Sequence, residues 1–269
     1  MLADGRSPPL PPPSVPHDAS PQAVMHVVRH APVFAATRPI IESLVVDGRW
    51  PTLAELGQVA ALRCEADQGP RRRRGLRPRA ELYDAQIAER SVLPTRPENW
   101  HDLFNVVTWA TFPLAKRALH ARQFRRLAER VPEHFDKLPG ARSEEQSALT
   151  QLDEGGMVIA LPPSPGESAA AHAQRLEALL LSLQTLAIAR VPLDAAHLAP
   201  FGAACRVFGH ALHEHLALGG LTPRATLVVL PVPPEQLDAA LAERLADESC
   251  PFRCAPASAW VTRTLDTTG

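Results

Sequence analysis

Side chains that could take part in catalysis or ligand binding are concentrated in one helical segment near the middle of the chain. His101 and Asn105 are four residues apart and Thr108 follows three residues later, so their side chains share one face of a helix. Leu103 and Val107 lie on another face of the same helix. This polar stripe on a mostly apolar helix indicates either part of a functional site or buried polar residues that fix helix packing.

A second candidate pair lies about one hundred residues later. His210 and Glu214 are also four residues apart and share a helix face. Histidine and glutamate at this spacing can ligate one metal ion, and glutamate can also act as a general base. The order of residues differs from the HExxH zinc motif. The alternative is a surface helix that carries this common pair without any ligand.

Two adjacent carboxylates and one lysine complete the candidate set. The segment LTQLDEGGMVIAL predicts a β-hairpin with Asp153 and Glu154 at its tip, where their oxygens could reach a divalent ion. The alternative is purely structural, because turns favour these residue types. Lys116 stands one turn into a helix that follows Pro113. It could contact an anionic substrate, or its side chain could extend along the surface.

The elements that must position these residues are mostly helices. Thr52 and Glu55 have the spacing of a capping box, and Pro113 marks the boundary between two consecutive helices, the second capped by Thr111. Two helical segments separated near Pro32 are expected within residues 23–47, and a short helix or an extended arm over residues 80–90. Further helices are expected over residues 168–188, 200–216 and after Pro234, and a buried strand over residues 225–232. The predicted fold is α+β, mainly helical, with a short β-hairpin and a few strands.

Composition sets the domain organisation and the compartment that we expect. The 269 residues are 45% hydrophobic and 21% charged, typical of a globular protein. We predict a disordered Pro-rich tail over residues 1–22 and a single globular domain over residues 23–269. No apolar stretch of about eighteen residues could span a membrane, and no signal peptide is apparent, which predicts a cytoplasmic protein without membrane contact. The four cysteines lack zinc or redox spacing and are expected to be free thiols.

Charge argues against nucleic acid as a general partner. The formal net charge is -1, so no overall field would attract the chain to a polyanion. One local basic run, Arg71, Arg72, Arg73 and Arg74, leaves nucleic-acid or phosphate contact open. The sequence also lacks the glycine-rich and nucleophile motifs of dinucleotide-binding enzymes, P-loop hydrolases and α/β-hydrolases.

Several of these segments resemble a bacterial protein family. NWHDLFNVVTWATFPLAK is similar to the hallmark segment of the domain of unknown function numbered 3025, and TRPENW, LDEGGMVIA and FGHALHEHL are similar to further blocks in the same order. The end of the chain departs from the pattern expected of the family, of which only Phe252 and Arg253 remain. The resemblance implies no known activity. It singles out the following residues: His101, Asp102, Asn105, Trp109, Lys116, Asp153, Glu154, His210 and Glu214.

Two functions are compatible with these residues. The first is a metal-dependent hydrolase or transferase, with His101, His210 and Glu214 as ligands of Mn²⁺ or Zn²⁺. Asp153 or Glu154 would be a further ligand or general base. Asn105 would belong to the catalytic group, and Lys116 would meet a phosphoester-like substrate. The second is a non-catalytic binding or scaffold module, in which the same side chains form a buried hydrogen-bond network. A site requires convergence on a solvent-reachable pocket, whereas a network would be dry and mutually satisfied.

Overall fold

A five-stranded mixed sheet forms the centre of the protein. The computed structural model describes residues 19–67, 76–219, 224–249, 251–253 and 258–261. The strand order is β6 (Pro192–Leu193), β9 (Ser258–Val261), β8 (Arg224–Leu230), β5 (Gly156–Ala160) and β7 (Ala204–Val207). β5 runs parallel to β8 and antiparallel to β7, with Val158 opposite both Val228 and Arg206. Every residue of β5 is buried, as expected for an inner strand covered on both faces.

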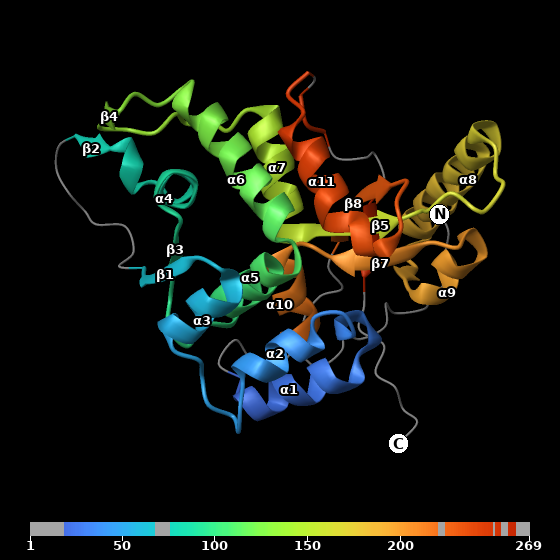
Figure 1. Ribbon diagram of the computed structural model, residues 1–269, viewed down its shortest axis with the longest axis horizontal. Helices are drawn as coiled ribbons and strands as arrows, with labels where there is room; N and C mark the ends of the chain where they lie inside the picture. The colour runs from blue at the N-terminus through green and yellow to red at the C-terminus, as the bar shows by residue number, and fades with distance from the viewer. Residues whose placement is uncertain (1–18, 68–75, 220–223, 250, 254–257, 262–269) are drawn as a thin grey trace, which may run out of the picture.

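Three helices cover one face of this sheet. They are α6 (Pro113–Ala128), α7 (Glu144–Gly155) and α11 (Leu237–Ala246), which lie together above β5 and β8 in Figure 1. Their apolar side chains and those of the strands form one buried cluster that includes Phe112, Leu149, Val158 and Leu241. Two backbone N–H groups at the start of α6 donate to Asp238 of α11, which binds the helix ends together.

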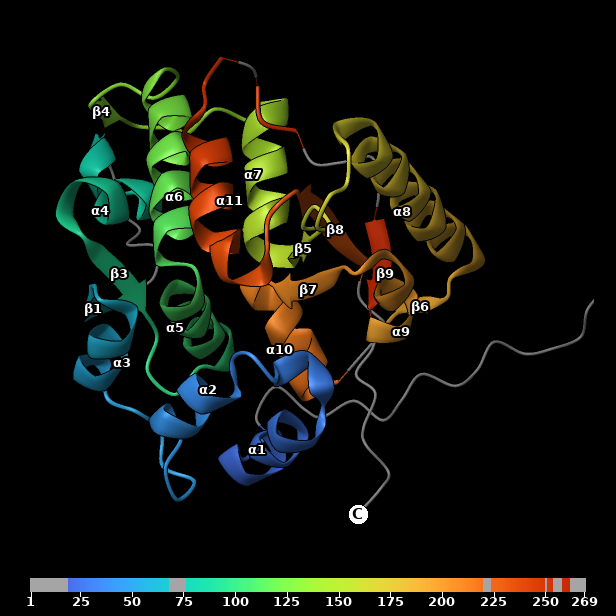
Figure 2. The same cartoon turned by 45° about the vertical axis from the view of Figure 1, so that its right-hand side comes forward.

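The other face packs against a second set of helices. α5 (Trp100–Thr111) and α10 (His210–Leu218) contact each other, and α1 (Pro21–His30), α2 (Arg38–Leu44) and α3 (Leu53–Ala60) surround them. The long helix α8 (Ala169–Ala189) packs beside β9, with Leu179 and Leu183 in the same core (Figure 2). The site residues lie between these two helical layers.

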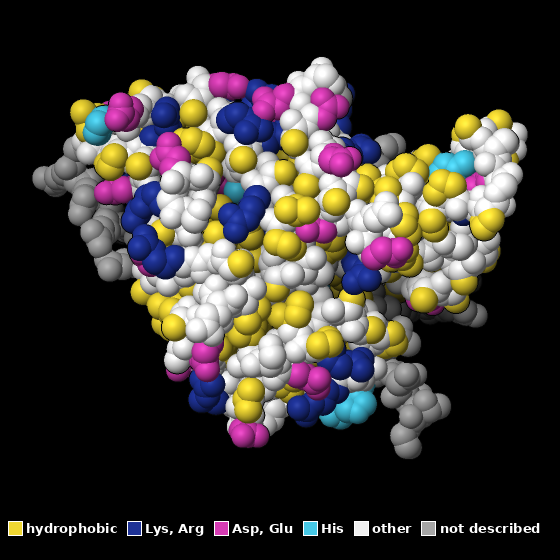
Figure 3. Space-filling view, in the orientation of Figure 1, with side chains coloured by type: hydrophobic (Ala, Val, Ile, Leu, Met, Phe, Trp, Pro, Cys, Tyr) yellow, Lys and Arg dark blue, Asp and Glu magenta, His cyan; other side chains and the backbone are white. Residues whose placement is uncertain are grey.

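Smaller elements complete the fold. β1 (Arg63–Ala66) pairs in parallel with β3 (Val92–Thr95), and β2 (Arg77–Pro78) pairs with β4 (His134–Phe135). α4 (Tyr83–Arg90) packs against α6. The remaining short elements are α9 (Ala195–Leu198) and the 3₁₀ helices η1 (Pro32–Phe34), η2 (Arg79–Glu81), η3 (Ala199–Phe201) and η4 (Pro234–Gln236). Acidic and basic side chains are interspersed on the face that Figure 3 presents.

Most sequence-based assignments of helices and strands are confirmed. The fold is mixed α+β and mainly helical. The Thr52 hydroxyl accepts from the Glu55 backbone N–H at 3.3 Å, and the Glu55 carboxylate accepts from the Thr52 N–H at 2.7 Å, which completes the predicted capping box. Helix α8, strand β8 and helix α11 occupy the predicted segments, and Leu237, Leu241 and Leu245 are buried. Among the residues described, no helix is both long and apolar enough to cross a membrane.

The predicted hairpin at residues 149–161 was wrong. Residues Glu144–Gly155 form helix α7, which begins with a capping box between Ser143 and Gln146, and the strand starts only at Gly156. Leu149 and Leu152 are three residues apart and both fully buried, a helical spacing that the Asp-Glu-Gly-Gly turn signal obscured. Asp153 and Glu154 therefore lie in the last turn of a helix and not at a hairpin tip.

Three further boundaries differ from the prediction. Residues 200–216 divide into η3, the edge strand β7 and helix α10, because β7 pairs with β5 in a contact that local sequence does not encode. Phe112, and not Thr111, occupies the N-cap of α6, since the Thr111 hydroxyl donates to the Val107 carbonyl. α1 begins at Pro21, inside the predicted tail, while residues 1–18 of that tail and the Arg71–Arg74 run lie outside the described residues. Cys64 and Cys205 are free thiols, as predicted.

Candidate metal centre

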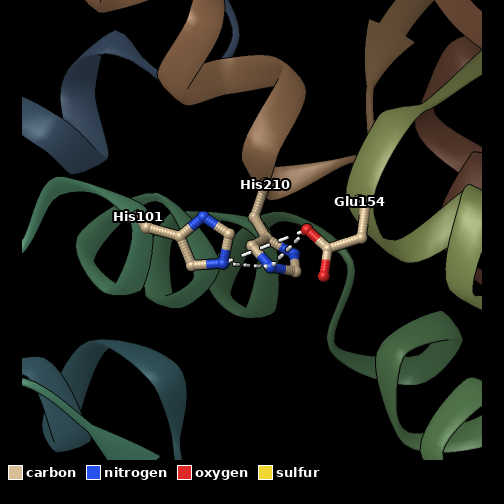
Figure 4. A group of neighbouring side chains, drawn as sticks. All are labelled: His101, Glu154 and His210. Carbon is tan, nitrogen blue, oxygen red and sulfur yellow. Dashed lines mark hydrogen bonds and ion pairs between the residues drawn. The ribbon is translucent and has the colours of Figure 1, made fainter. Parts of the chain in front are cut away.

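Three helix ends bring two imidazoles and one carboxylate together. His101 belongs to the first turn of α5, Glu154 to the last turn of α7, and His210 is the first residue of α10. Figure 4 shows the His101 ring and the Glu154 carboxylate directed at the His210 ring from opposite sides. These three residues offer ligand atoms within 4.8 Å of one another and could hold a metal ion.

The spacing of the three atoms suits a single ion. The two Nε2 atoms of His101 and His210 are 3.0 Å apart, and Glu154 Oε2 lies 3.3 Å from His210 Nε2 and 3.9 Å from His101 Nε2. Ligands on one tetrahedral ion are about 3.3 Å apart when each bond is about 2.0–2.1 Å long. The triangle therefore has nearly the dimensions of one face of such a tetrahedron, and the fourth position is left for water or substrate.

A second carboxylate lies behind each histidine. Glu214 accepts a hydrogen bond from His101 Nδ1 at 2.9 Å, on the side of the ring away from the other ligand atoms. Asp153 Oδ1 lies 3.8 Å from His210 Nδ1. Ligand histidines usually direct their second nitrogen to a carboxylate, which fixes the ring and its tautomer. Glu214, predicted as a ligand, thus contacts the outer nitrogen of His101, and Glu154 takes the inner position.

Close backbone contact between α7 and α10 produces this arrangement. The N–H groups of Phe208 and Gly209 both donate to the Gly156 carbonyl, at 2.9 and 2.8 Å. A Cβ on Gly209 would lie 2.4 Å from the Glu154 carbonyl oxygen, and one on Gly156 would lie 2.3 Å from the Leu152 oxygen. Only glycine permits both approaches, so these two residues allow Glu154 and His210 to stand side by side.

Burial and neighbouring charge prepare the two histidines differently. Burial lowers the pKa of His210 to about 3, so its ring is neutral and keeps a lone pair for a ligand bond. The hydrogen bond to Glu214 raises the pKa of His101. Burial, with the charge of Asp153 in second place, raises the pKa of Glu154, whose side chain is 46% exposed.

Lys116 is fully buried, which corrects the expected surface position. Its ammonium group pairs with Asp153 beneath the metal centre and stands near the Trp109 ring. Burial alone would raise the pKa of Asp153, but the charge of Lys116 holds it below its ordinary value. Asp153 is therefore an ionised, anchored carboxylate, and Lys116 neutralises it at a position that a cavity ligand does not reach.

A second carboxylate–histidine pair was not predicted from the sequence. His120 Nδ1 lies 2.9 Å from Asp84 Oδ1, and His120 Nε2 lies 4.0 Å from Asp153 Oδ2. The His120 ring is buried and stacks on Trp109 at an interplanar angle of 8°. Lys116 and His120 are four residues apart on α6, a spacing that could have indicated a shared face. Asp84 gave no local signal, because α4 reaches α6 only in the tertiary structure.

Asn105 lies in the same group of residues. Its side-chain N–H donates to the Tyr83 hydroxyl at 2.8 Å, and burial raises the pKa of that hydroxyl. The Asn105 Oδ1, His120 Nε2 and His210 Nδ1 atoms are buried and have no hydrogen-bond partner among the described residues. Unpaired buried polar atoms are rare, and several in one place indicate a site that water, an ion or a ligand serves.

A cavity of about 530 Å³ connects these groups to solvent. The candidate metal ligands His101, His210 and Glu154, the Asp84–His120 pair and Asn105 all line it. Three arginines line it as well. Arg96 forms a bidentate pair with Asp102, Arg130 donates to Gln146, and Arg142 is exposed with no ion pair to any described residue. The wall thus combines ligand atoms with cations that are not fully neutralised.

Comparison with known proteins gives a family but no activity. The family model described as "Protein of unknown function (DUF3025)" matches residues 73–267, which is more than half of the chain and includes His101, Glu154 and His210. No curated protein and no solved structure matches.

Proposed function

The chain belongs to this family of proteins of unknown function, and from its own side chains we propose that it is a metal-dependent hydrolase acting on an anionic, phosphoester-like substrate. The observation that carries the proposal is the His101–His210–Glu154 triangle with a carboxylate behind each imidazole. Two imidazoles, one carboxylate and an open position are the ligand set of catalytic zinc sites. A bound divalent ion would lower the pKa of a coordinated water and polarise a substrate oxygen.

We assign the remaining residues to substrate binding and proton transfer. Arg142 and Arg130 stand on the cavity wall, where guanidinium groups would bind the substrate's anionic oxygens. The position of these two arginines supports an anionic substrate. They would make the contact with negative charge that was predicted for Lys116. His120, held at Nδ1 by Asp84, is the assigned proton carrier, because a carboxylate fixes the tautomer of a histidine that accepts and returns protons. Glu214 orients the His101 ring through its hydrogen bond, and Asp153 places a negative charge near His210 Nδ1.

The rival interpretation, a buried network that only joins helices, fits the geometry less well. A structural network would be dry and mutually satisfied. Here the Glu154 side chain is 46% exposed and the His101 side chain 29% exposed, and the polar atoms of Asn105, His120 and His210 lack partners among the described residues. Among the residues of this site, the buried Lys116–Asp153 ion pair is the one that resembles a structural network joining helices.

Elemental analysis of the purified full chain tests the metal centre. We expect close to one zinc or manganese ion per chain, lost in Glu154→Gln and in His101→Ala and kept in the control His134→Ala, which changes an exposed histidine of β4. Circular dichroism verifies that each variant folds. Absence of metal from the wild type after incubation with Zn²⁺ and Mn²⁺ would overturn the proposal. Iron as the bound metal would confirm the ligand set and leave the reaction to the substrate assay, because two histidines and a carboxylate form oxygenase iron sites and iron also activates water for hydrolysis.

Hydrolysis of p-nitrophenyl phosphate and bis(p-nitrophenyl) phosphate tests the substrate class. We expect metal-dependent release of nitrophenol by the wild type, a raised KM with little change of kcat for Arg142→Gln, and a reduced kcat for Asp84→Asn. A metal-loaded protein that cleaves neither phosphoester would retain the metal centre and reject the phosphoester substrate.

A further inference from the structure

A second cavity lies beside α10, about one helical turn further along this helix than the metal centre. It has a volume of about 350 Å³ and runs along β7, the edge strand of the sheet, towards η1 and α9. His213 lines this cavity, whereas His210, three residues earlier on the same helix, lines the first one. Figure 2 shows β7, α9 and α10 meeting in this part of the molecule. Small-molecule sites usually have volumes of about 300–1,000 Å³, so the size suits a small ligand.

The cavity wall is mainly apolar. Its larger apolar side chains come from five different elements or loops: Pro32, Val33, Met157, Leu193, Leu198 and Val207. Two hydroxyl groups in the wall are already bound to backbone carbonyls, that of Thr37 to Phe34 and that of Thr111 to Val107. Asp194 caps α9 and pairs with His197. These polar groups are therefore satisfied within the protein and do not require a ligand.

Arg206 is the cationic residue of this wall. It is half-buried on β7, where its backbone pairs with Val158, and its guanidinium makes no ion pair or hydrogen bond with any described residue. Its side chain leaves the strand on the face opposite to those of Val207 and Met157, so it stands at the edge of the cavity and not among the apolar side chains. Its partial burial still makes its attraction for a carboxylate stronger than in bulk water. Ala204, two residues earlier on the strand, shares its face and is exposed. A ligand whose anionic end meets Arg206 would thus pass over Ala204.

His213 provides a second polar point in the same wall. Its ring is buried between Phe34 and Phe104, with the latter stacked at 10°, and neither ring nitrogen has a partner among the described residues. An unpaired buried polar atom costs about 1–3 kcal/mol. His213 is therefore a polar point of the wall that the described residues leave unsatisfied.

We infer that this second cavity binds a small carboxylate with an apolar chain or ring, its carboxylate at Arg206 and its apolar part along the edge of β7. Apolar walls reward the hydrocarbon part of such a molecule, and the arginine selects its charge. A ligand there contacts α10 at His213, about one turn after His210. The site is separate from the metal centre, and the inference does not depend on the proposed hydrolase activity.

Isothermal titration calorimetry with octanoate tests the inference on the full chain in excess EDTA, so that a carboxylate cannot bind through a metal ion. The matched ligand is 1-octanol, which has the same chain length and no charge. We expect octanoate to bind more tightly than octanol, and Arg206→Gln to weaken octanoate binding about tenfold or more while octanol binding stays the same. Ala204→Trp, which fills the exposed approach, should abolish binding of both.

Three outcomes would overturn the inference. One is equal affinity of the wild type for octanoate and octanol. Another is wild-type affinity for octanoate in both Arg206→Gln and Ala204→Trp, which would show that octanoate binds at a different site. The third is octanoate binding that appears only with added zinc and disappears in Glu154→Gln, which would assign it to the metal centre. Thermal unfolding of each variant verifies that lost binding does not reflect lost folding.

Discussion

Replacement of Glu214 by glutamine tests whether a carboxylate behind His101 supports metal binding. Glu214→Gln keeps the size of the side chain and its ability to accept a hydrogen bond from His101 Nδ1, but removes the negative charge 2.9 Å from the ring. We expect weaker zinc binding with the fold intact. The hydrogen bond alone would orient the ring nearly as before, so the loss reports the charge.

The size of the effect follows from the contact distance and the exposure of the pair. A ligating imidazole is neutral, so Glu214 acts on the divalent ion beyond the ring, at somewhat more than about twice the 2.9 Å contact distance. The doubled charge offsets the doubled distance, so the attraction is close to that of two unit charges 2.9 Å apart, about 1.4 kcal/mol in water and about 6 kcal/mol at an effective dielectric constant of 20. The side chains of His101 and Glu214 are 29% and 15% exposed, and solvent therefore screens part of this attraction. The lower part of the range, about 1.4–2.7 kcal/mol, corresponds to a loss of about 10–100-fold in affinity, typical of carboxylates that support a ligand histidine.

Competition with a chromophoric zinc chelator measures the affinity. Glu154→Gln, which removes a ligand, should lose more than Glu214→Gln, and Glu243→Gln on the exposed face of α11 should bind as the wild type does. Wild-type affinity in Glu214→Gln beside a large loss in Glu154→Gln would refute the role given to the outer carboxylate. Unchanged affinity in both variants would refute the metal centre itself.

Three further changes have defined outcomes. Gly209→Ala places a Cβ 2.4 Å from the Glu154 carbonyl oxygen, so we expect a loss of about 1–3 kcal/mol in urea unfolding together with weaker zinc binding. Lys116→Met leaves Asp153 buried without its partner and should cost about 3–5 kcal/mol in the same assay. Burial lowers the pKa of His213 from 6.5 to about 3 in the folded protein. As pH falls from 6.5 towards 3, this histidine binds a proton in the unfolded state but not in the folded state, so the free energy of unfolding decreases. His213→Leu should reduce that slope by about 1.4 kcal/mol per pH unit.

Each change has a control and a contrary result. Gly140→Ala, where a Cβ would meet no atom within 4 Å, should leave unfolding unchanged, and equal behaviour of the two glycine variants would contradict the close approach. Adding Asp153→Asn to Lys116→Met should recover much of the stability, and a simple sum of two losses would argue against a coupled pair. An acid slope that is the same with leucine at position 213 would assign the pH dependence to other groups.

Local sequence determined the elements that carry their own signals. The capping box at Thr52, the proline at the start of α6 and the leucine spacing of α8 and α11 describe interactions within a few residues, and each predicted the observed element. The same logic identified the three segments that bear His101, Glu154 and His210. It misassigned Asp153 and Glu154 to a hairpin because Asp-Glu-Gly-Gly is compatible with a turn and with the end of a helix.

Tertiary structure alone decided which side chains meet, and therefore their roles. The i,i+4 spacing of His210 and Glu214 suggested a shared ligand pair, yet α10 crosses α5 so that Glu214 meets the outer nitrogen of His101. Lys116 pairs with Asp153 of α7, 37 residues later in the sequence. Asp84 pairs with His120 of α6, 36 residues later. A one-dimensional spacing fixes the face of a helix that a residue occupies, whereas contact between helices depends on packing of the whole core. Residue types thus indicated metal chemistry, and the packing assigned the inner and outer positions.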